Sequence, residues 1–400
     1  MELLAPAGGI EQLRAAVRFG ADAVYLASDR FGMRARAANF KLEDIPQAVA
    51  IAHAAGAKVH VTANILMGQS DLPALPDYFR ALDEAGVDAF IIGDLGMASI
   101  ARRVAPRVAL HVSTQGSVAN AEAARVWHDL GAVRVVCARE MSLDDIARMR
   151  EDMPADMELE AFAHGAMCMA VSGRCLISSY LTGRSGNRGH CTQPCRWSYT
   201  LEEEKRPGEH FPIEEDGRGT FILNAKDLNM LSHLDELRAA GVDSIKIEGR
   251  NKKAFYVASV VNAYRQVLDG APAAMGTDNF GEAEQAPDYD GYEQQAMHVA
   301  DVVEASGEEL VARCRNRFAE GDELEVLAPR VPVRRVTVRN LVWLPDPTEE
   351  TPDPEPVPVP VANRSCGIYR FCARTAGGEG VVASAGDFLR VRKFRRSARH

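Results

Sequence analysis

The first 270 residues repeat one pattern, in which a short continuous apolar run is followed by an amphipathic stretch. The apolar runs are LLAPA, AVYLA, KVHVTAN, AFIIGD, ALHVST, RVVCARE, ELEAFAHG and SIKIEG. The predicted helices cover residues 10–19, 43–55, 75–85, 97–104, 120–130, 143–151 and 254–268. Continuous apolar runs are typical of strands that are buried on both faces. Eight such strands, each followed by a helix or a long loop, predict a parallel β/α (TIM-like) barrel, with a doubly wound open sheet as the alternative.

Polar side chains stand where these predicted strands end. In a β/α barrel the chemistry sits at the carboxyl ends of the strands, which all open on the same face. The residues at these positions are Asn64, Asp94, His111, Ser113, Gln115, Arg139, Glu140, Glu160, His164, Glu248 and Arg250. The segments GADAVY, GVDAF, GAVRVV and GVDSIK precede strands and are typical of glycine caps at helix ends.

The pattern changes after residue 270. Residues 271–297 are acidic and poor in aliphatic side chains, which indicates a linker. Short strands then return as HVADVVE, ELVARCRN, DELEVLA, RRVTVRNLVWL and GIYRFC. They predict a small antiparallel β-domain over residues 298–400, most simply a barrel, with an exposed proline-rich loop at residues 345–360. The sequence therefore predicts a large barrel over residues 1–270 and a small β-domain after the linker.

Four of the eight cysteines fall within residues 160–196, after the seventh predicted strand. Their spacing is C-x6-C-x15-C-x3-C, and the surrounding residues are rich in Gly, Ser and Arg, a composition typical of a loop. Because this insertion, residues 164–220, leaves the barrel at a strand's carboxyl end, we expect it to cover the barrel mouth.

Four nearby thiols have several explanations. The chain opens with MELLAPAGG, without a basic region or a long apolar run, so we expect a cytoplasmic protein in which stable disulfides do not form. A zinc site usually has two short C-x2–4-C pairs, and this segment has one. An iron–sulfur cluster accepts thiolates at more variable spacing, and the neighbouring arginines would offset its negative charge. The spacing by itself does not decide between a zinc site and an iron–sulfur cluster. A third interpretation is that the four cysteines are unrelated and only pack in the core.

Composition limits the choice of partner. The chain of 400 residues is 46% hydrophobic and 26% charged, and its apolar runs are far shorter than the ~20 residues of a membrane span. Its formal net charge is −10, so an RNA partner would need a local basic face. Candidates for such a face in the small domain are Arg313, Arg315, Arg330, Arg334 and Arg335.

The segment FAHGAMCMAVSGRC, followed by NRGHCTQPCR, resembles the signature of the peptidase U32, or collagenase-like, family. LLAPAGG, ADAVYLA, HVSTQ and IKIEGR resemble the same family in the same order, and the resemblance covers residues 1–270 before resuming at NRFAEGDELEVL. It implies a [4Fe–4S] cluster. The implied ligands are Cys168, Cys175, Cys191 and Cys195.

The same resemblance implies an enzyme that hydroxylates without O2. Its substrates in the family are the wobble uridine of tRNA, ribosomal RNA or the ubiquinone ring. The closing C-x3-C is closest to the tRNA 5-hydroxyuridine branch, for which the expected partners are tRNA and a small carboxylate, prephenate, as oxygen donor. A zinc-stabilised RNA-binding scaffold and a peptidase are the alternatives, although the sequence has neither H-E-x-x-H nor G-x-S-x-G.

Other polar residues are candidates for the site itself. Glu248 and Arg250, in IKIEGR, are predicted to act in catalysis by binding a carboxylated or phosphorylated ligand, or else to form a buried ion pair. In NAKDL, Lys226 and Asp227 are catalytic candidates and Asn224 a substrate contact; the alternative for Asp227 is an N-cap of the next helix.

The remaining candidates lie elsewhere among the predicted strand ends. His164 precedes the first cysteine of the segment, so it is predicted to tune the cluster or move a proton, or else only to hold the loop. Asn64, Ser113 and Gln115 are predicted to contact the substrate.

Overall fold

The structure is a computed structural model of the chain. It describes residues 1–33, 39–168, 170, 173–197, 200–202, 207–208, 210–212, 215–216, 219–220, 227–272, 296–347, 353–375 and 383–392. The chain divides into two compact units, which are described separately below. The first consists of Met1–Val261 with Glu284–Tyr292, and the second of Asn262–Ala283 with Glu293–His400.

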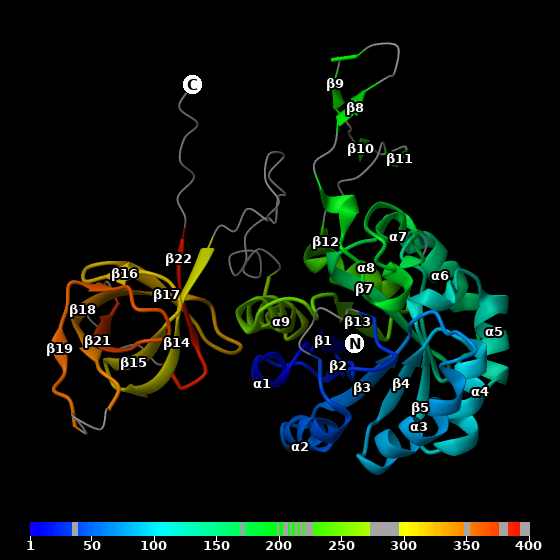
Figure 1. The fold of residues 1–400 in the computed structure, drawn as a ribbon, viewed down its shortest axis with the longest axis horizontal. Helices are drawn as coiled ribbons and strands as arrows, with labels where there is room; N and C mark the ends of the chain where they lie inside the picture. The colour runs from blue at the N-terminus through cyan, green and yellow to red at the C-terminus, as the bar shows by residue number, and fades with distance from the viewer. Residues whose placement is uncertain are drawn as a thin grey trace. The chain divides into compact units, whose positions relative to one another are not determined.

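The first unit is a closed barrel of eight parallel strands (Figure 1). In chain order these are β1 (Glu2–Pro6), β2 (Ala23–Leu26), β3 (Lys58–Ala63), β4 (Ala89–Ile92), β5 (Ala109–Val112), β6 (Arg134–Val136), β7 (Glu158–Ala166) and β13 (Ser244–Ile247). Each of β1 to β6 pairs with the next, β6 pairs with β7, and β13 closes the ring by pairing with both β7 and β1. The predicted parallel barrel is confirmed, and the open sheet is excluded by the closing pairs.

Helices surround the strands, and seven of them lie where the amphipathic stretches predict them, whereas the helix at Leu234–Ala239 was not predicted (Figure 1). Their bounds are α1 (Ile10–Arg18), α2 (Ile45–Ala54), α3 (Leu75–Glu84), α4 (Leu95–Val104), α5 (Ala121–Asp129), α6 (Leu143–Asp152), α8 (Leu234–Ala239) and α9 (Ala254–Leu268). Side chains that accept backbone N–H groups begin three of them: Asp94 for α4, Asn120 for α5 and Ser142 for α6. Gly86 and Gly131 follow α3 and α5 at φ values of 80° and 86°, as expected of glycine caps.

The chain between β7 and β13 forms the insertion that carries the cysteines. It contains the short helix α7 (Ile177–Thr182) and the strand pairs β8 (Thr200–Glu202) with β9 (His210–Pro212), and β10 (Glu215–Asp216) with β11 (Gly219–Thr220). It ends in β12 (Asp227–Asn229), which pairs antiparallel with β7. The N-cap alternative for Asp227 is wrong, because Asp227 lies in this strand opposite Ala166 and α8 begins seven residues later.

The second unit is a closed barrel of six antiparallel strands, which confirms the predicted small barrel. Around the ring these are β17 (Glu323–Leu327), β22 (Phe388–Arg392), β14 (Ala296–Ser306), β15 (Glu309–Cys314), β21 (Ile368–Arg374) and β18 (Arg334–Leu344), and β18 pairs back to β17. Two short antiparallel pairs lie beside this ring. Strand β19 (Val357–Pro358) pairs with β18, and β16 (Phe318–Ala319) pairs with β20 (Val361–Ala362). The predicted proline-rich loop is therefore partly wrong, since β19 lies inside it at the edge of the sheet, where proline is tolerated.

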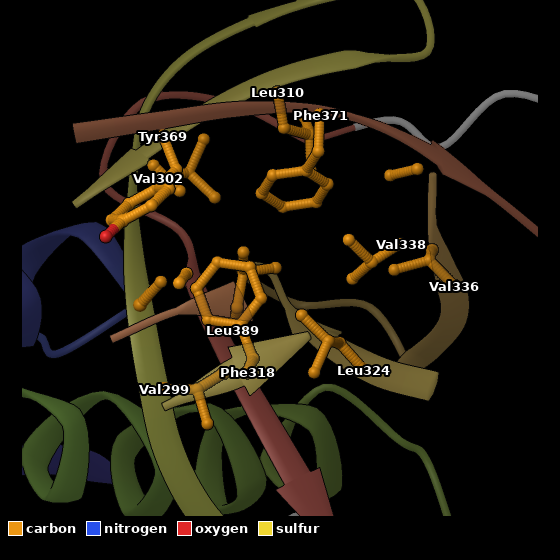
Figure 2. Close-up of a cluster of buried hydrophobic side chains, with 14 of the residues drawn as sticks. Val299, Val302, Leu310, Phe318, Leu324, Val336, Val338, Tyr369, Phe371 and Leu389 are labelled. Atoms are coloured by element: carbon orange, nitrogen blue, oxygen red, sulfur yellow. The ribbon is translucent and has the colours of Figure 1, made fainter. Parts of the chain in front are cut away.

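The core of the second unit is apolar (Figure 2). Phe318, Tyr369 and Phe371 pack edge to face, with Phe318 at 6.2 Å from the Tyr369 ring and 5.7 Å from the Phe371 ring between centroids. Alternate residues of β15, β18 and β21 are buried, as expected for strands with one face inside a barrel. None of the helices in the described part of the chain combines the length and the apolar character that a membrane span needs.

Candidate active site at the barrel mouth

A pocket opens at the carboxyl ends of the barrel strands and holds about 560 Å³ of space, part of it open to solvent. It is lined by Tyr25, Met33, Thr62, Asn64, Ile91, Ser113, Thr114, Gln115, Val136, Arg139, Phe162, Cys168, Gly173, Lys246, Glu248 and Arg250. Six residues predicted to belong to the site are thus brought together: Asn64, Ser113, Gln115, Cys168, Glu248 and Arg250.

Three cations and one carboxylate line this mouth pocket. Arg139 Nη2 lies 3.4 Å from Glu248 Oε2, and its Nη1 donates to the Ala166 carbonyl at 3.3 Å. Its guanidinium stacks on the Phe162 ring at 4.0 Å from the centroid. The Arg250 guanidinium donates to the Met33 carbonyl. The excess of positive charge fits an anionic ligand, as expected from the strand-end Arg250.

One N–H group of Arg139 makes no hydrogen bond within the described part of the chain. Its side chain is 7% exposed, and its Nε is buried without a hydrogen-bond partner among the described residues. A buried N–H without a partner costs free energy, on the order of 1–3 kcal/mol. Because Arg139 also lines the mouth pocket, its guanidinium is a candidate for contact with an anionic ligand.

Lys246 forms part of the pocket floor. Its Nζ lies 2.9 Å from Glu160 Oε1 and 4.5 Å from the centroid of the Tyr25 ring. Burial lowers the pKa of Lys246, and the charge of Glu160 acts in the opposite direction. Burial by itself would raise the pKa of Glu160, but Lys246 and Arg134 outweigh it and the pKa lies below its usual value. Glu160 therefore remains a carboxylate under the pocket.

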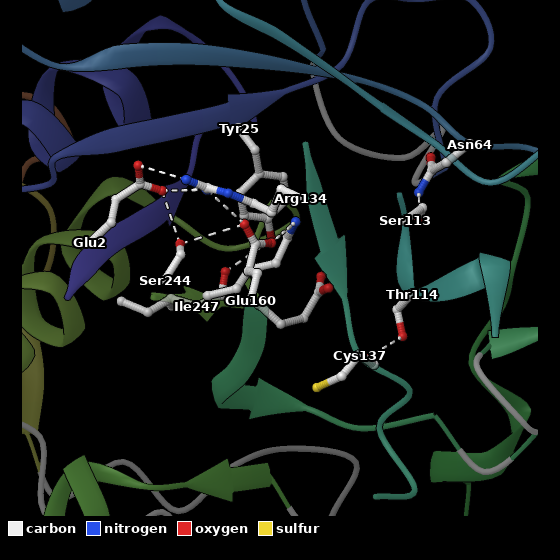
Figure 3. A network of polar contacts seen from close by, with 12 residues as sticks. Glu2, Tyr25, Asn64, Ser113, Thr114, Arg134, Cys137, Glu160, Ser244 and Ile247 are labelled. Carbon is white, nitrogen blue, oxygen red and sulfur yellow. Dashed lines mark hydrogen bonds and ion pairs between the residues drawn. The ribbon is translucent and has the colours of Figure 1, made fainter. Parts of the chain in front are cut away.

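An ionic network continues from Glu160 into the barrel interior (Figure 3). Arg134 donates to Glu160 at 3.0 Å, to Glu158 at 2.7 Å and to Glu2 at 2.5 Å, and the Ser244 hydroxyl donates to Glu2 at 2.9 Å. Burial would raise the pKa of Glu2, but the hydrogen bond and charge of Arg134 lower it to about 2. The network joins β1, β6, β7 and β13. Through Glu160 it fixes the position of the Lys246 ammonium.

Two histidines complete this polar interior. The rings of His60 and His111 meet edge to face, 4.7 Å apart between centroids. Burial lowers the pKa of His60 to about 4 and that of His111 well below its usual value, so both are neutral near pH 7. The prediction that His111 and Glu160 belong to the site at the carboxyl ends of the strands is wrong, because both side chains are buried inside the barrel and neither lines the mouth pocket.

The polar rim of the pocket is connected by hydrogen bonds. Asn64 Oδ1 accepts the Met33 N–H at 3.1 Å, and its Nδ2 donates to Ser113 Oγ at 3.3 Å (Figure 3). Ser113 Oγ also accepts the Gln115 N–H at 3.4 Å. These contacts fix the orientation of the Asn64 amide and leave the Gln115 side chain facing the pocket.

His164 and Asp227 lie away from the mouth pocket. The register between β7 and β13 shifts after Lys246, so that Lys246 pairs with Phe162 but Ile247 pairs with His164. This bulge leaves Phe162 facing the pocket and places His164 beside Tyr256 of α9, 6.2 Å away between ring centroids. Burial lowers the pKa of His164 to about 4. Asp227 lies in β12, while Asn224 and Lys226 fall outside the described residues.

The cysteine segment, residues 167–197, covers the entrance of the mouth pocket, as expected. Arg174 Nη2 donates to the Gln115 carbonyl at 2.6 Å, and the Leu66 N–H donates to the Asn187 carbonyl at 2.8 Å. Arg188 forms a two-point ion pair with Asp71 at 2.9 and 3.0 Å. A second, smaller pocket lies between the segment and the barrel. Its lining is Asn64, Ile65, Leu66, Gly93, Asp94, Gln115, Arg174 and Asn187.

All four cysteines of the segment are half-buried. The N–H groups of Ile177 and Gln193 donate to the sulfurs of Cys175 and Cys191 at 3.4 and 3.3 Å, which is the kind of hydrogen bond that stabilises cluster thiolates. The donor chemistry therefore fits an iron–sulfur cluster. Within the part of the chain that the structure describes, no three His, Cys, Asp or Glu side chains are placed to hold a metal.

Sequence reasoning missed part of the pocket. The strand pattern placed Arg139 at a strand end but predicted no role for it. It did not predict that Lys246, Tyr25 and Phe162 line the pocket. The available signal was a lysine in the middle of the apolar strand SIKI, because a charged side chain there must find a partner inside the barrel.

Comparison with known proteins gives a consistent family. Residues 8–324 match the family described as Peptidase family U32. The chain is 38% identical over 360 residues to tRNA hydroxylation protein P1 of Bacillus subtilis, covering 82% of this chain and 84% of that protein. It is 33% identical over 392 residues to tRNA hydroxylation protein P of Escherichia coli, covering 82% and 86%. It is 35% identical over 358 residues to the 23S rRNA 5-hydroxycytidine synthase of Escherichia coli, covering 82% and 53%.

Proposed function

This chain belongs to peptidase family U32, and from that premise we propose that it is an enzyme that hydroxylates the wobble uridine of tRNA without O2, forming 5-hydroxyuridine. The observation that carries the proposal is the similarity to two proteins named for tRNA hydroxylation, which extends over more than four fifths of both chains in each case. The relative named for rRNA hydroxylation supports the same chemistry on an RNA base and makes rRNA the second candidate substrate.

The mouth pocket supports a small carboxylate as co-substrate. Replacing the C5–H bond of uracil by C5–OH is a two-electron oxidation. A donor that supplies the oxygen from a C–OH group would itself be reduced by two electrons, its C–OH becoming C–H, and would have to bind beside the base. Arg139, Lys246 and Arg250 would hold its carboxylates, and the rings of Tyr25 and Phe162 would pack against its apolar part. We propose prephenate, a dicarboxylate, as this donor.

Lys246 is the residue best placed to hold or move a proton. Its ammonium lies in the pocket, and burial lowers its pKa, while the carboxylate of Glu160 acts in the opposite direction. Glu160 and the ionic network below keep it from moving. Glu248 pairs with Arg139 and would orient that guanidinium toward the ligand.

Cys168, Cys175, Cys191 and Cys195 would hold a [4Fe–4S] cluster above this pocket. When bound, the cluster supplies one-electron transfer. Cys168 lines the pocket itself, which would bring the cluster's edge close to the ligand. The arginines of the segment would offset the negative charge of the bound thiolates.

Two other functions have less support. A peptidase needs an activated nucleophile, and the described residues that line the mouth pocket include no histidine or aspartate beside Ser113 or Cys168. A zinc-stabilised scaffold accounts for the thiols but not for the buried cations beneath them.

The test combines a deletion strain with a cysteine variant. The wild-type gene should restore 5-hydroxyuridine derivatives to the tRNA of a deletion strain, as measured by nucleoside mass spectrometry. Cys191→Ala should lose the modification, and the protein purified without air should lose its iron, about four atoms per chain in the wild type. Cys372→Ala, which changes a half-buried cysteine outside the segment, should keep both.

The outcomes separate the alternatives. Unchanged tRNA with altered rRNA or quinones in the deletion strain would refute the tRNA substrate. Colourless wild-type protein that contains zinc would refute the cluster and favour the scaffold.

A further inference from the structure

The cysteine segment differs in charge from the rest of the molecule. Residues 167–197 include four arginines and one histidine but no aspartate or glutamate, in a chain whose net charge is −10. One of these arginines, Arg188, is neutralised by Asp71 and fastens the segment to the barrel. The segment is therefore a local basic face on an acidic protein, which is what binding of a polyanion requires.

Large apolar side chains are exposed on the same segment. Tyr180 of α7 is 89% exposed and Leu176, just before the helix, is 72% exposed. The arginines on either side of the helix, Arg174 and Arg184, are also exposed. Exposed aromatic rings between cationic side chains are typical of surfaces that bind single-stranded nucleic acid, because bases stack on the rings while cations contact phosphates.

This surface is continuous with the candidate active site. Arg174 lines the second pocket together with Asn64 and Gln115, and these two residues also line the mouth pocket. A strand of RNA that crosses α7 would therefore pass the entrance through which a base reaches the mouth pocket.

We infer that Arg174, Leu176, Tyr180 and Arg184, the α7 surface, bind the single-stranded anticodon loop of the RNA substrate. Arg174 and Arg184 contact phosphates, and Tyr180 stacks on a base next to the one that is modified. This inference rests on the proposed function and adds the place at which the RNA docks.

Charge favours RNA over a protein partner on this surface. The core of a protein–protein interface is depleted of charged residues, whereas the exposed apolar groups here are flanked by arginines. Apart from the four cysteines, whose bound thiolates the arginines would partly offset, the residues of 167–197 that are charged at pH 7 are all arginines, which match a phosphate backbone.

The test measures binding of the full-length, cluster-loaded protein to an anticodon stem-loop RNA with uridine at the wobble position. Tyr180→Ala should weaken binding on the order of 10-fold, and Tyr180→Phe should retain it, because stacking needs the ring and not the hydroxyl. Arg184→Gln should lower the slope of log K against log salt by about 0.7, and Arg184→Lys should restore it.

Matched controls lie on the outer helices. Arg103 is an exposed arginine in the last turn of α4, and Val126 is an exposed apolar residue of α5. Arg103→Gln and Val126→Ala should leave both the affinity and the salt slope unchanged. The same melting temperature for all variants shows that the substitutions do not unfold the protein.

The readouts distinguish this inference from the proposed function. If the wild-type gene restores 5-hydroxyuridine and the Tyr180→Ala and Arg184→Gln variants bind RNA as the wild type does, the α7 surface is not the docking site, and a protein partner becomes its better assignment. If the wild-type gene fails to restore the modification, the proposed function is wrong, whatever the variants bind.

Discussion

At the scale of single residues, Arg139 is a side chain of the mouth pocket that is placed to bind the proposed carboxylate co-substrate. It is fixed by Glu248, the Ala166 carbonyl and the Phe162 ring, yet its buried Nε has no partner among the described residues. A guanidinium that lines the pocket and is held on three sides is preorganised to contact a ligand. The carboxylate of the co-substrate is the acceptor that the proposed reaction supplies.

We therefore expect Arg139→Gln to raise the KM for prephenate on the order of 10- to 100-fold, because a hydrogen bond to a charged group contributes about 1.5–3 kcal/mol. Arg139→Lys should recover little of this loss, since the ammonium lacks the planar fork. The measurement is the initial rate of 5-hydroxyuridine formation against prephenate concentration. Arg107→Gln, at an exposed ion pair with Asp83, is the control, and an unchanged KM for Arg139→Gln would refute the assignment.

At the scale of elements, the strands of the large barrel share a polar interior. His60 of β3, His111 of β5 and Arg134 of β6 lie where a β/α barrel usually has branched apolar side chains. Because the buried histidines are neutral, folding is linked to pH. The unfolded chain binds a proton at His60 near pH 6.5, whereas the folded barrel accepts one only near pH 4.

The free energy of unfolding should therefore fall as the pH is lowered from about 6.5 to about 4, by up to about 3 kcal/mol for His60. Glu2, whose pKa is lowered to about 2, loses its contribution only below the pKa of an unfolded glutamate, so it acts at lower pH. His60→Asn should make the pH dependence across this window shallower in urea titrations, and the slope that remains comes from the other buried histidines, His111 and His164. His53→Asn, on the surface of α2, should keep it; an equal slope in His60→Asn and wild type would contradict the linkage.

At the scale of the whole molecule, the two units each have a core of their own. Phe371 of β21 is 1% exposed and packs against Phe318 inside the antiparallel barrel. A unit with its own core is expected to unfold cooperatively by itself.

We expect Phe371→Ala to lower the stability of the second unit by about 3–5 kcal/mol, because the substitution leaves a cavity in a closed barrel. Hydrogen exchange followed by mass spectrometry should show faster exchange in peptides from β14 to β22 and no change in peptides from β1 to β6. Val357→Ala, at an exposed position of β19, is the control. Equal loss of protection in both units would show that they unfold as one.

Much of this organisation was predictable from local sequence. The eight apolar runs and the amphipathic stretches between them identify the barrel because burial on both faces requires continuous apolar strands. Asn64, Ser113, Gln115, Glu248 and Arg250 were found by one rule, that the carboxyl ends of parallel strands meet. The rule failed for His164, because a bulge in β7 turns that side chain outward, and a bulge leaves no mark in the periodicity.

The sequence by itself determined the order of the eight parallel strands and of seven of their helices, the two barrels and the place of the cysteine segment, because each depends on periodicity and chain order. Helix α8 and strand β22, which completes the ring of the second unit, were not predicted. Only the tertiary structure decided which charged groups meet. Ser244 contacts Glu2 across 242 positions of sequence, and Lys246 finds Glu160 in a neighbouring strand, because closure of the barrel joins β13 to β1 and β7. Local patterns contain no information about such contacts, since the partners come together only when the ring closes.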